Sequence, residues 1–97
     1  MYQLDFSPEA REDLRWLRNY DQKRILEETE TQLLHQPDQV TRNQKRLRPN
    51  KLAEWELRIG AFRVFYEVDA TNAMVKIAAV GYKKGNKLLI RGEEREL

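Results

Sequence analysis

The chain has 97 residues, 35% of them charged and 40% hydrophobic, which fits one small domain over residues 1–97 with a single core. It contains no cysteine and one histidine, His35, which excludes disulfides, thiol nucleophiles and the common zinc sites, and we expect no metal and no cofactor. The formal net charge is only +2. No apolar run approaches the roughly 20 residues of a membrane span, and the N-terminus lacks signal-peptide features. We therefore expect a cytoplasmic protein without a membrane partner.

The first residues predict a short strand that leads into a helix. Three apolar residues that alternate with polar ones form the strand: Tyr2, Leu4 and Phe6. Ser7 and Pro8 are typical of a helix start, because a serine oxygen accepts a free backbone N–H and proline loses no hydrogen bond at the first helical position. The apolar stripe of this helix consists of Ala10, Leu14 and Leu17.

A second helix follows after a short connection and completes a helical hairpin. Asp21 can cap its start, and the pattern continues to about Gln36, where Pro37 prevents further helix. Its predicted buried face consists of Ile25, Leu26, Thr29 and Leu33. Residues 37–50 contain turn-forming residues among basic ones and predict a loop.

A β-hairpin is predicted from residues 52–59 and 62–68, with Gly60-Ala61 as a two-residue turn that has glycine first, as a type II′ turn prefers. In that register, opposing residue numbers sum to 121. One face is then apolar and carries the pairs Ile59–Phe62, Leu57–Val64 and Trp55–Tyr66. The other is mainly charged and carries Arg58–Arg63, Glu56–Phe65 and Glu54–Glu67. A shift of one residue would mix the two faces, so the pattern favours this register.

A third strand is predicted over residues 74–82, after a turn at residues 69–72. Its expected core residues are Val75, Ile77 and Ala79, and its expected residues on the charged face are Lys76, Ala78, Val80 and Tyr82. The predicted fold class is therefore α+β: an N-terminal strand, a helical hairpin and an antiparallel meander whose apolar face packs against the helices.

Positive charge is concentrated in two short segments. Residues 42–51 contain five basic residues and residues 83–91 contain four, in both cases without an acid, so these segments hold nine of the 18 cations. Clusters of this kind favour binding to a polyanion, although a single solvated run is ordinary protein surface. Arg58 and Arg63 lie directly opposite each other and would repel unless an anion or nearby acids compensate, which makes this pair a candidate phosphate fork.

Two aromatic residues lie off the apolar stripe of the first helix. Trp16 and Tyr20 are four residues apart and could form a patch for a partner helix, or could pack on the loop at 37–50. Both alternatives stay open from the sequence.

The order of these elements, with the segments WELRIGAFRVFYEVD (55–69) and AVGYKKGNKL (79–88), resembles the RelE/ParE superfamily of toxins from bacterial type II toxin–antitoxin modules. The resemblance covers nearly the whole chain. Members of the RelE branch are small ribonucleases that cut mRNA, usually in the ribosomal A site, whereas members of the ParE branch poison DNA gyrase. The resemblance implies a cognate antitoxin as partner, and mRNA with the ribosome, or alternatively DNA gyrase, as the target.

Site residues follow from the resemblance position by position. Arg63 matches the strand arginine that contacts the scissile phosphate, and Lys83 lies where a basic residue follows the third strand. Glu54 and Glu56 stand where RelE has lysines, and Leu89 stands where RelE has a catalytic tyrosine, although some RelE-like members use a glutamate as base.

If the chain cleaves RNA, a ribose 2′-OH would attack the adjacent phosphate. The expected base is Glu54 or Glu56, and Lys83 or Lys84 would assist the leaving group. Six further residues are expected to bind RNA or phosphate: Arg58, Lys51, Arg46, Arg48, Lys45 and Lys87. The alternatives are a ParE-like gyrase inhibitor without nuclease activity and a catalytically degenerate binding module.

Overall fold

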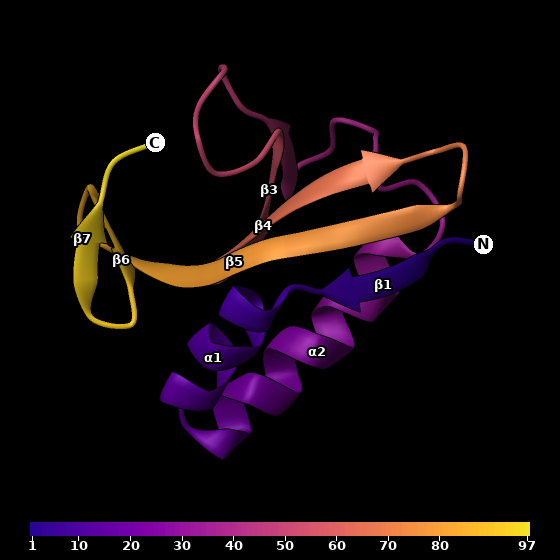
Figure 1. The fold of residues 1–97 in the computed structure, drawn as a ribbon. Helices are drawn as coiled ribbons and strands as arrows, with labels where there is room; N and C mark the ends of the chain where they lie inside the picture. Colours follow the sequence, from indigo (N-terminus) through magenta and orange to yellow (C-terminus); the bar gives the residue numbers. More distant parts are fainter.

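Two helices pack against one face of a twisted seven-stranded sheet in the computed structural model, which describes residues 1–97 (Figure 1). The elements in chain order are β1 (Gln3–Phe6), α1 (Pro8–Trp16), α2 (Asn19–Leu33), β2 (Gln44–Arg46), β3 (Trp55–Ile59), β4 (Phe62–Asp69), β5 (Met74–Lys84), β6 (Lys87–Ile90) and β7 (Glu93–Arg95). Strands β2 to β7 are adjacent in sequence order and antiparallel, and β1 pairs with β5 in parallel. The predicted α+β class and order of elements are confirmed. Strands β2, β6 and β7 and the parallel pairing of β1 were not predicted.

The start of α1 agrees with the sequence, whereas the bounds of α2 differ. Ser7 accepts a hydrogen bond from the backbone N–H of Ala10 at 3.0 Å, with Pro8 at the first helical position. Helix α2 begins at Asn19, so the prediction that Asp21 caps it is wrong; Asp21 lies inside the first turn. The helix ends at Leu33 rather than near Gln36, and the carbonyl of Leu34 accepts the backbone N–H of Tyr2 at 2.8 Å. Neither helix is long and apolar enough to cross a membrane.

The β3–β4 register is confirmed in every predicted pair from Ile59–Phe62 to Trp55–Tyr66. Gly60 has a φ of +59°, which is the left-handed conformation that the first position of a type II′ turn requires. The side chains that face the helices form the main core: Ala10, Leu14, Ile25, Leu33, Trp55, Leu57, Ile59, Val64, Tyr66, Val75, Ile77 and Val80. Leu26 was expected in this core but is 37% exposed, because it lies beyond the buried stripe of α2.

A bulge in β5 overturns part of the predicted face assignment. Tyr66 pairs with Ile77 while the preceding Phe65 pairs with Ala79, so Ala78 is an extra residue that reverses the alternation. Val80 therefore joins the main core, and Ala79 packs with Phe65 on the opposite face.

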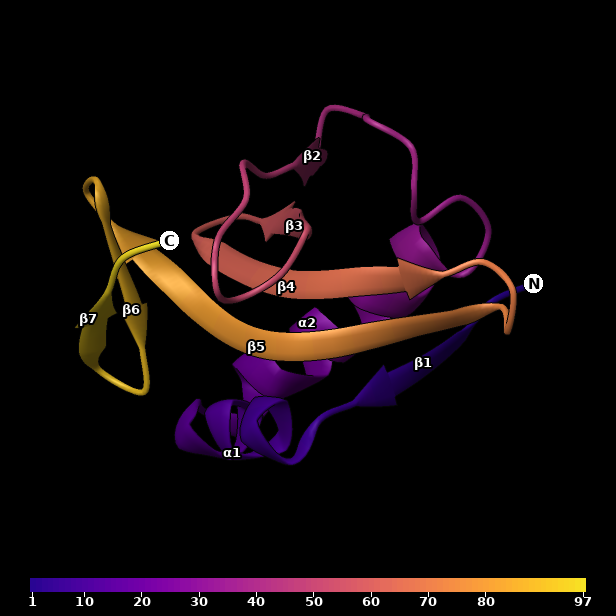
Figure 2. The same ribbon diagram turned by 45° about the horizontal axis from the view of Figure 1, so that its top comes forward.

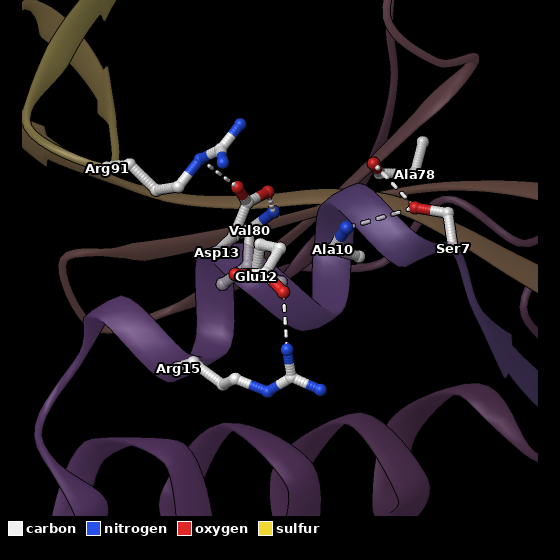
Figure 3. Close-up of polar contacts among 8 residues, drawn as sticks. All are labelled: Ser7, Ala10, Glu12, Asp13, Arg15, Ala78, Val80 and Arg91. Atoms are coloured by element: carbon white, nitrogen blue, oxygen red, sulfur yellow. Dashed lines mark hydrogen bonds and ion pairs between the residues drawn. The ribbon is translucent and has the colours of Figure 1, made fainter.

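Helix α1 provides hydrogen bonds to the backbone of this bulge. The Ser7 hydroxyl donates to the carbonyl of Ala78 at 3.1 Å, and the Asp13 carboxylate accepts the N–H of Val80 at 2.9 Å (Figure 3). Both groups belong to an edge of β5 that β1 no longer covers after Ile77, so α1 satisfies backbone groups that would otherwise lack partners.

The face of the sheet away from the helices, called the outer face below, is not the open charged surface that the sequence predicted. A second apolar cluster covers part of it and contains Ala53, Phe65, Ala79, Leu88 and Ile90, with Leu47, Leu52 and Ala78 packed against it. Phe65 is fully buried, and Glu56 and Arg63 are only 5% and 8% exposed. The residues that cover this face come from the loop after β2 and from strand β6. The alternation of apolar and polar residues along β3 and β4 gives no information about these segments.

Gly81 allows β6 to cross closely over β5, and we predict that Gly81→Ala destabilises the fold. A Cβ at this position would lie 2.5 Å from the carbonyl oxygen of Leu89 and 2.9 Å from Cγ1 of Ile90. Backbone must move to make room, and we expect a loss of about 2 to 3 kcal/mol in the free energy of unfolding, measured by denaturant titration. Gly85→Ala is the control, because nothing lies within 4 Å of the added atom and only its φ of +65° is unfavourable, at about 1 kcal/mol. Equal losses for the two variants would contradict the prediction.

Candidate functional site

A buried carboxylate and a buried guanidinium lie side by side on the outer face, close to the β3–β4 turn. Glu56 Oε1 is 4.0 Å from Arg63 Nε, and the two side chains are 6% and 10% exposed. Arg63 Nη1 donates to the carbonyls of Gly60 and Phe62, both at 2.8 Å, which fixes the guanidinium against the turn. Arg63 Nε is buried and makes no hydrogen bond, so one donor of the group remains without a partner.

Burial lowers the pKa of Arg63, Glu56 opposes this effect and Arg58 adds to it. An arginine pKa starts so high that the group stays cationic at neutral pH. The site therefore holds a fixed positive charge in a poorly hydrated position, where electrostatic interactions are stronger than in water.

Other cations surround this pair. Arg58 lies opposite Arg63 on β3, and Lys45 lies opposite Glu56 on β2, so both share the outer face with the pair. The backbone N–H of Lys83 donates to the carbonyl of Ala61 at 2.8 Å, which brings that part of β5 to the same turn. Four cations and one carboxylate thus lie around one end of the sheet.

The structure separates the two candidate glutamates. Glu54 is exposed and pairs with Arg46, with 3.3 Å between carboxylate oxygen and guanidinium nitrogen. The Arg46 guanidinium also lies 5.7 Å from the ring centre of Trp55, a core residue. Glu56, and not Glu54, is therefore the carboxylate beside Arg63.

The basic loop after β2 is held in shape by one asparagine. The Asn50 amide donates to the carbonyls of Arg48 and Ala53 at 2.7 and 2.8 Å, and its oxygen accepts the N–H groups of Leu52 and Ala53 at 2.7 and 3.0 Å. Arg48 and Lys51 are exposed on this ordered loop. A hollow of about 430 Å³ is lined by residues 45–50 together with Leu97.

The second basic segment forms the β5–β6 hairpin. Lys84 and Lys87 lie opposite each other and are exposed at its tip, while Lys83 is half-buried. A second hollow, of about 550 Å³, is lined by Lys83, Asn86, Lys87, Leu88, Glu94, Arg95, Glu96 and Leu97. Leu97 lines both hollows, so the C-terminal residues lie between the basic loop and this hairpin (Figure 2).

Sequence reasoning missed two further residues, Arg95 and Asp13, which belong to or contact the C-terminal hairpin. Arg95 faces Leu88, which in turn faces Lys83, in a row across three strands. The sequence feature that could have indicated the β6–β7 hairpin, and with it the position of Arg95, is the Arg91-Gly92 pair. Both residues have positive φ in the structure, as in a tight two-residue hairpin turn.

Asp13 holds this C-terminal hairpin against α1. It is 3% exposed, and its Oδ1 lies 3.0 Å from Arg91 Nε while its Oδ2 accepts the N–H of Val80 (Figure 3). Burial raises the pKa of Asp13, although the Val80 N–H and the cations Arg91 and Arg95 act in the opposite direction. No group of three histidine, cysteine, aspartate or glutamate side chains is arranged to hold a metal ion.

Comparisons with known proteins agree with this architecture. The family model of the ParE toxin of the type II toxin–antitoxin system parDE matches residues 4–86. The RelBE2 toxin–antitoxin complex of Mycobacterium tuberculosis contains a chain that is 27% identical, with a TM-score of 0.73, and the match covers 84% of this chain and 98% of that chain. A comparison with curated proteins gives no match.

Two more distant structures share the fold. A chain of the intact Escherichia coli RelBE complex is 22% identical with a TM-score of 0.66, over 88% of this chain and 100% of that chain. The YoeB dimer of Staphylococcus aureus is 24% identical with a TM-score of 0.62, over 86% of this chain and 98% of that chain.

Proposed function

The chain belongs to the ParE toxin family of type II toxin–antitoxin systems, and we propose that this toxin acts as an mRNA interferase, a ribonuclease that cuts mRNA. The observation that carries the proposal is the Glu56–Arg63 pair among the cations of the outer face. A carboxylate beside a fixed guanidinium combines a proton acceptor with a phosphate-binding group, the two functions that RNA cleavage needs. The likeness to RelBE2 supports the same assignment.

The proposed reaction is an attack of the ribose 2′-oxygen on the adjacent phosphorus. Glu56 takes the proton of the 2′-OH as the new P–O bond forms, and Arg63 and Arg58 stabilise the negative charge that develops on the phosphorane. The bond from phosphorus to the 5′-oxygen then breaks, and Lys83 donates a proton to that oxygen. The products are a 2′,3′-cyclic phosphate and a 5′-hydroxyl. Lys83 is preferred to Lys84 because it lies closer to the turn, on the half-buried part of β5.

The proposal is tested with the purified chain and a defined mRNA, with and without ribosomes. We expect cleavage that leaves cyclic phosphate ends, and a loss of about 10²- to 10⁴-fold in rate for Glu56→Gln. Glu54→Gln is the matched control, since it removes the exposed carboxylate two residues before Glu56. Its rate should stay within about threefold of the wild type. The reverse order of the two variants would contradict the assignment of the base.

A second candidate function is inhibition of DNA gyrase, which the match to the ParE family model favours. A supercoiling assay distinguishes the two functions. A chain that blocks gyrase and leaves mRNA intact would overturn the interferase proposal, and a chain inert to both targets would leave only a binding module.

The basic segment at residues 42–51, which includes the end of β2 and the basic loop after it, provides a separate prediction about RNA binding. Replacing Arg46 and Arg48 together with glutamine should flatten the salt dependence of RNA or ribosome binding. The slope of log K against log salt is expected to fall by about 1.4, because each contact to a single-stranded phosphate contributes about 0.7. The control replaces Arg11 and Lys23, two exposed cations on the helices, with glutamine, which should leave the slope unchanged. An unchanged slope for the loop variant would assign the loop to ordinary solvated surface.

A further inference from the structure

A mainly apolar hollow of about 290 Å³ lies where the helical hairpin meets the start of β4 and the end of β5, and it is called the aromatic groove here. Three of its four apolar residues are aromatic, and its full lining consists of Trp16, Leu17, Arg18, Asp21, Phe62 and Tyr82. Trp16 is 54% exposed, so much of the indole is open to solvent. Aromatic side chains that solvent can reach are the surfaces on which unpaired nucleobases stack.

Trp16 is supported by the chain's own backbone. A Cβ at Gly92 would lie 3.0 Å from Trp16 Cζ2 and 3.3 Å from its Cη2, so the indole lies against the Arg91–Gly92 turn. The structure thus places Trp16 against this turn and not against the loop at 37–50, from which no residue lines the groove. A ring that is already supported loses little conformational entropy when a ligand covers it, which favours stacking.

The charge around the aromatic groove favours an anionic ligand. Residues 15–24 contain four cations and one acid. That acid, Asp21, pairs with Arg18 at 3.3 Å and its side chain is 14% exposed, whereas the Arg18 side chain is 86% exposed. The guanidinium of Arg24 reaches the β3–β4 turn, 3.0 Å from where a Cβ of Gly60 would lie. The exposed charge beside the aromatic rings is therefore positive, and a stacking surface with flanking cations is the combination that binds single-stranded nucleic acid.

Each strand residue of the aromatic groove directly precedes a cation of the candidate site. Phe62 comes before Arg63 on β4, Tyr82 comes before Lys83 on β5, and Phe62 pairs with Tyr82 across the two strands. Successive side chains of a strand point to opposite faces, so the groove and Arg63 lie on the two faces of one end of the sheet. Arg24 lies at the turn between them. A single strand that passes around this end would place a phosphate at Arg63 and a nearby base in the groove.

We propose that the aromatic groove is a stacking site for one unpaired nucleobase of the RNA strand whose phosphate lies at Arg63. This inference rests on the proposed function, because RNA is the ligand. A base is favoured over an apolar peptide segment, because three of the four apolar lining residues present planar rings and the adjoining strand positions carry cations of the candidate site. Every base has a π-face, so we expect little preference among the four bases.

The test measures the affinity of the purified toxin for two short single-stranded probes that it cannot cleave, a 2′-O-methyl RNA and the same sugar–phosphate backbone without bases. Trp16→Leu keeps an apolar side chain but loses the ring, and it should raise the Kd for the base-containing probe about fivefold or more. Its Kd for the abasic probe should stay within about twofold of the wild type, which also shows that the variant is folded. Binding of the base-containing probe should quench the fluorescence of Trp16, which is the part of the emission that Trp16→Leu lacks. Tyr20→Leu is the matched control: Tyr20 is 77% exposed and aromatic but absent from the groove, and both Kd values should stay within about twofold of the wild type.

Equal affinity of the wild type for the two probes, or an equal effect of Trp16→Leu on both, would overturn the base-stacking site. Weaker binding of Trp16→Leu to a protein partner, with both probes bound as by the wild type, would also overturn it, since a protein would then be the occupant. Because neither probe can be cleaved, these Kd values do not depend on the reaction. A chain that cleaves mRNA but binds both probes equally would overturn this inference alone, whereas a chain that binds bases in the groove but leaves mRNA intact would overturn only the proposed function.

Discussion

Arg63→Lys is expected to lower RNA cleavage about 10²- to 10³-fold while the protein remains folded. Lysine keeps a positive charge beside Glu56, so the buried carboxylate is not left without a partner. A single ammonium group cannot both replace the bonds from Nη1 to the carbonyls of Gly60 and Phe62 and present a planar pair of donors to a phosphate. Loss of one preorganised donor to the transition state typically costs this much in rate.

The measurement combines cleavage of a defined mRNA, growth inhibition at matched expression and the melting temperature. Lys76→Ala is the control, because Lys76 is exposed on the outer face of β5 but pairs with Glu67, away from the site. Lys76→Ala removes a full positive charge, whereas Arg63→Lys removes none, and the activity of Lys76→Ala should nevertheless be unchanged. Wild-type growth inhibition by Arg63→Lys would show that the fork geometry has no role in toxicity.

The elements that the sequence predicted well are those whose signals are local. The β3–β4 hairpin combines a turn that prefers glycine first with alternation on both strands, and these two signals agree on one register. The helix start at Ser7 is equally local, since the cap needs only a side-chain oxygen and the N–H of Ala10.

The errors in the sheet come from contacts between residues far apart in the chain. The bulge at Ala78 is accompanied by hydrogen bonds from Ser7 and Asp13, which are more than sixty positions away. No pattern within β5 indicates them, so alternation placed Val80 on the wrong face. Asp13 itself reads as an ordinary helix-surface acid until the sheet edge is placed beside it.

The sequence predicted which residues of the candidate site lie near one another but not how deeply they are buried. Arg63, Arg58 and Lys45 lie together as the hairpin register and the charge clusters implied, and the structure places Glu56 rather than Glu54 beside them. The loop after β2 and strand β6 cover part of the outer face, which the sequence did not predict, and Glu56 and Arg63 on that face are only 5% and 8% exposed. That burial changes the expected chemistry from a solvated phosphate fork to a fixed, partly desolvated one.

Trp55→Ala is expected to reduce the free energy of unfolding by about 3 to 5 kcal/mol, as is typical when a large aromatic residue is removed from a core. Trp55 is 4% exposed, and its ring stacks on that of Tyr66 with centres 6.1 Å apart. The Tyr66 hydroxyl donates to the carbonyl of Pro37 at 2.8 Å, so the cavity would also loosen the residue that fixes the end of the helical hairpin to the sheet.

Denaturant titration of Trp55→Ala beside Trp16→Ala separates core packing from the general effect of losing an indole. Trp16 is 54% exposed and lies close to Gly92, so its replacement should cost about 1 kcal/mol. Small domains have total stabilities of only about 5 to 15 kcal/mol, so Trp55→Ala should leave a substantial unfolded fraction at growth temperature and abolish toxicity through loss of the fold. Equal stability of the two variants would contradict the placement of Trp55 between the helices and the sheet, and with it the assignment of the opposite face to the site.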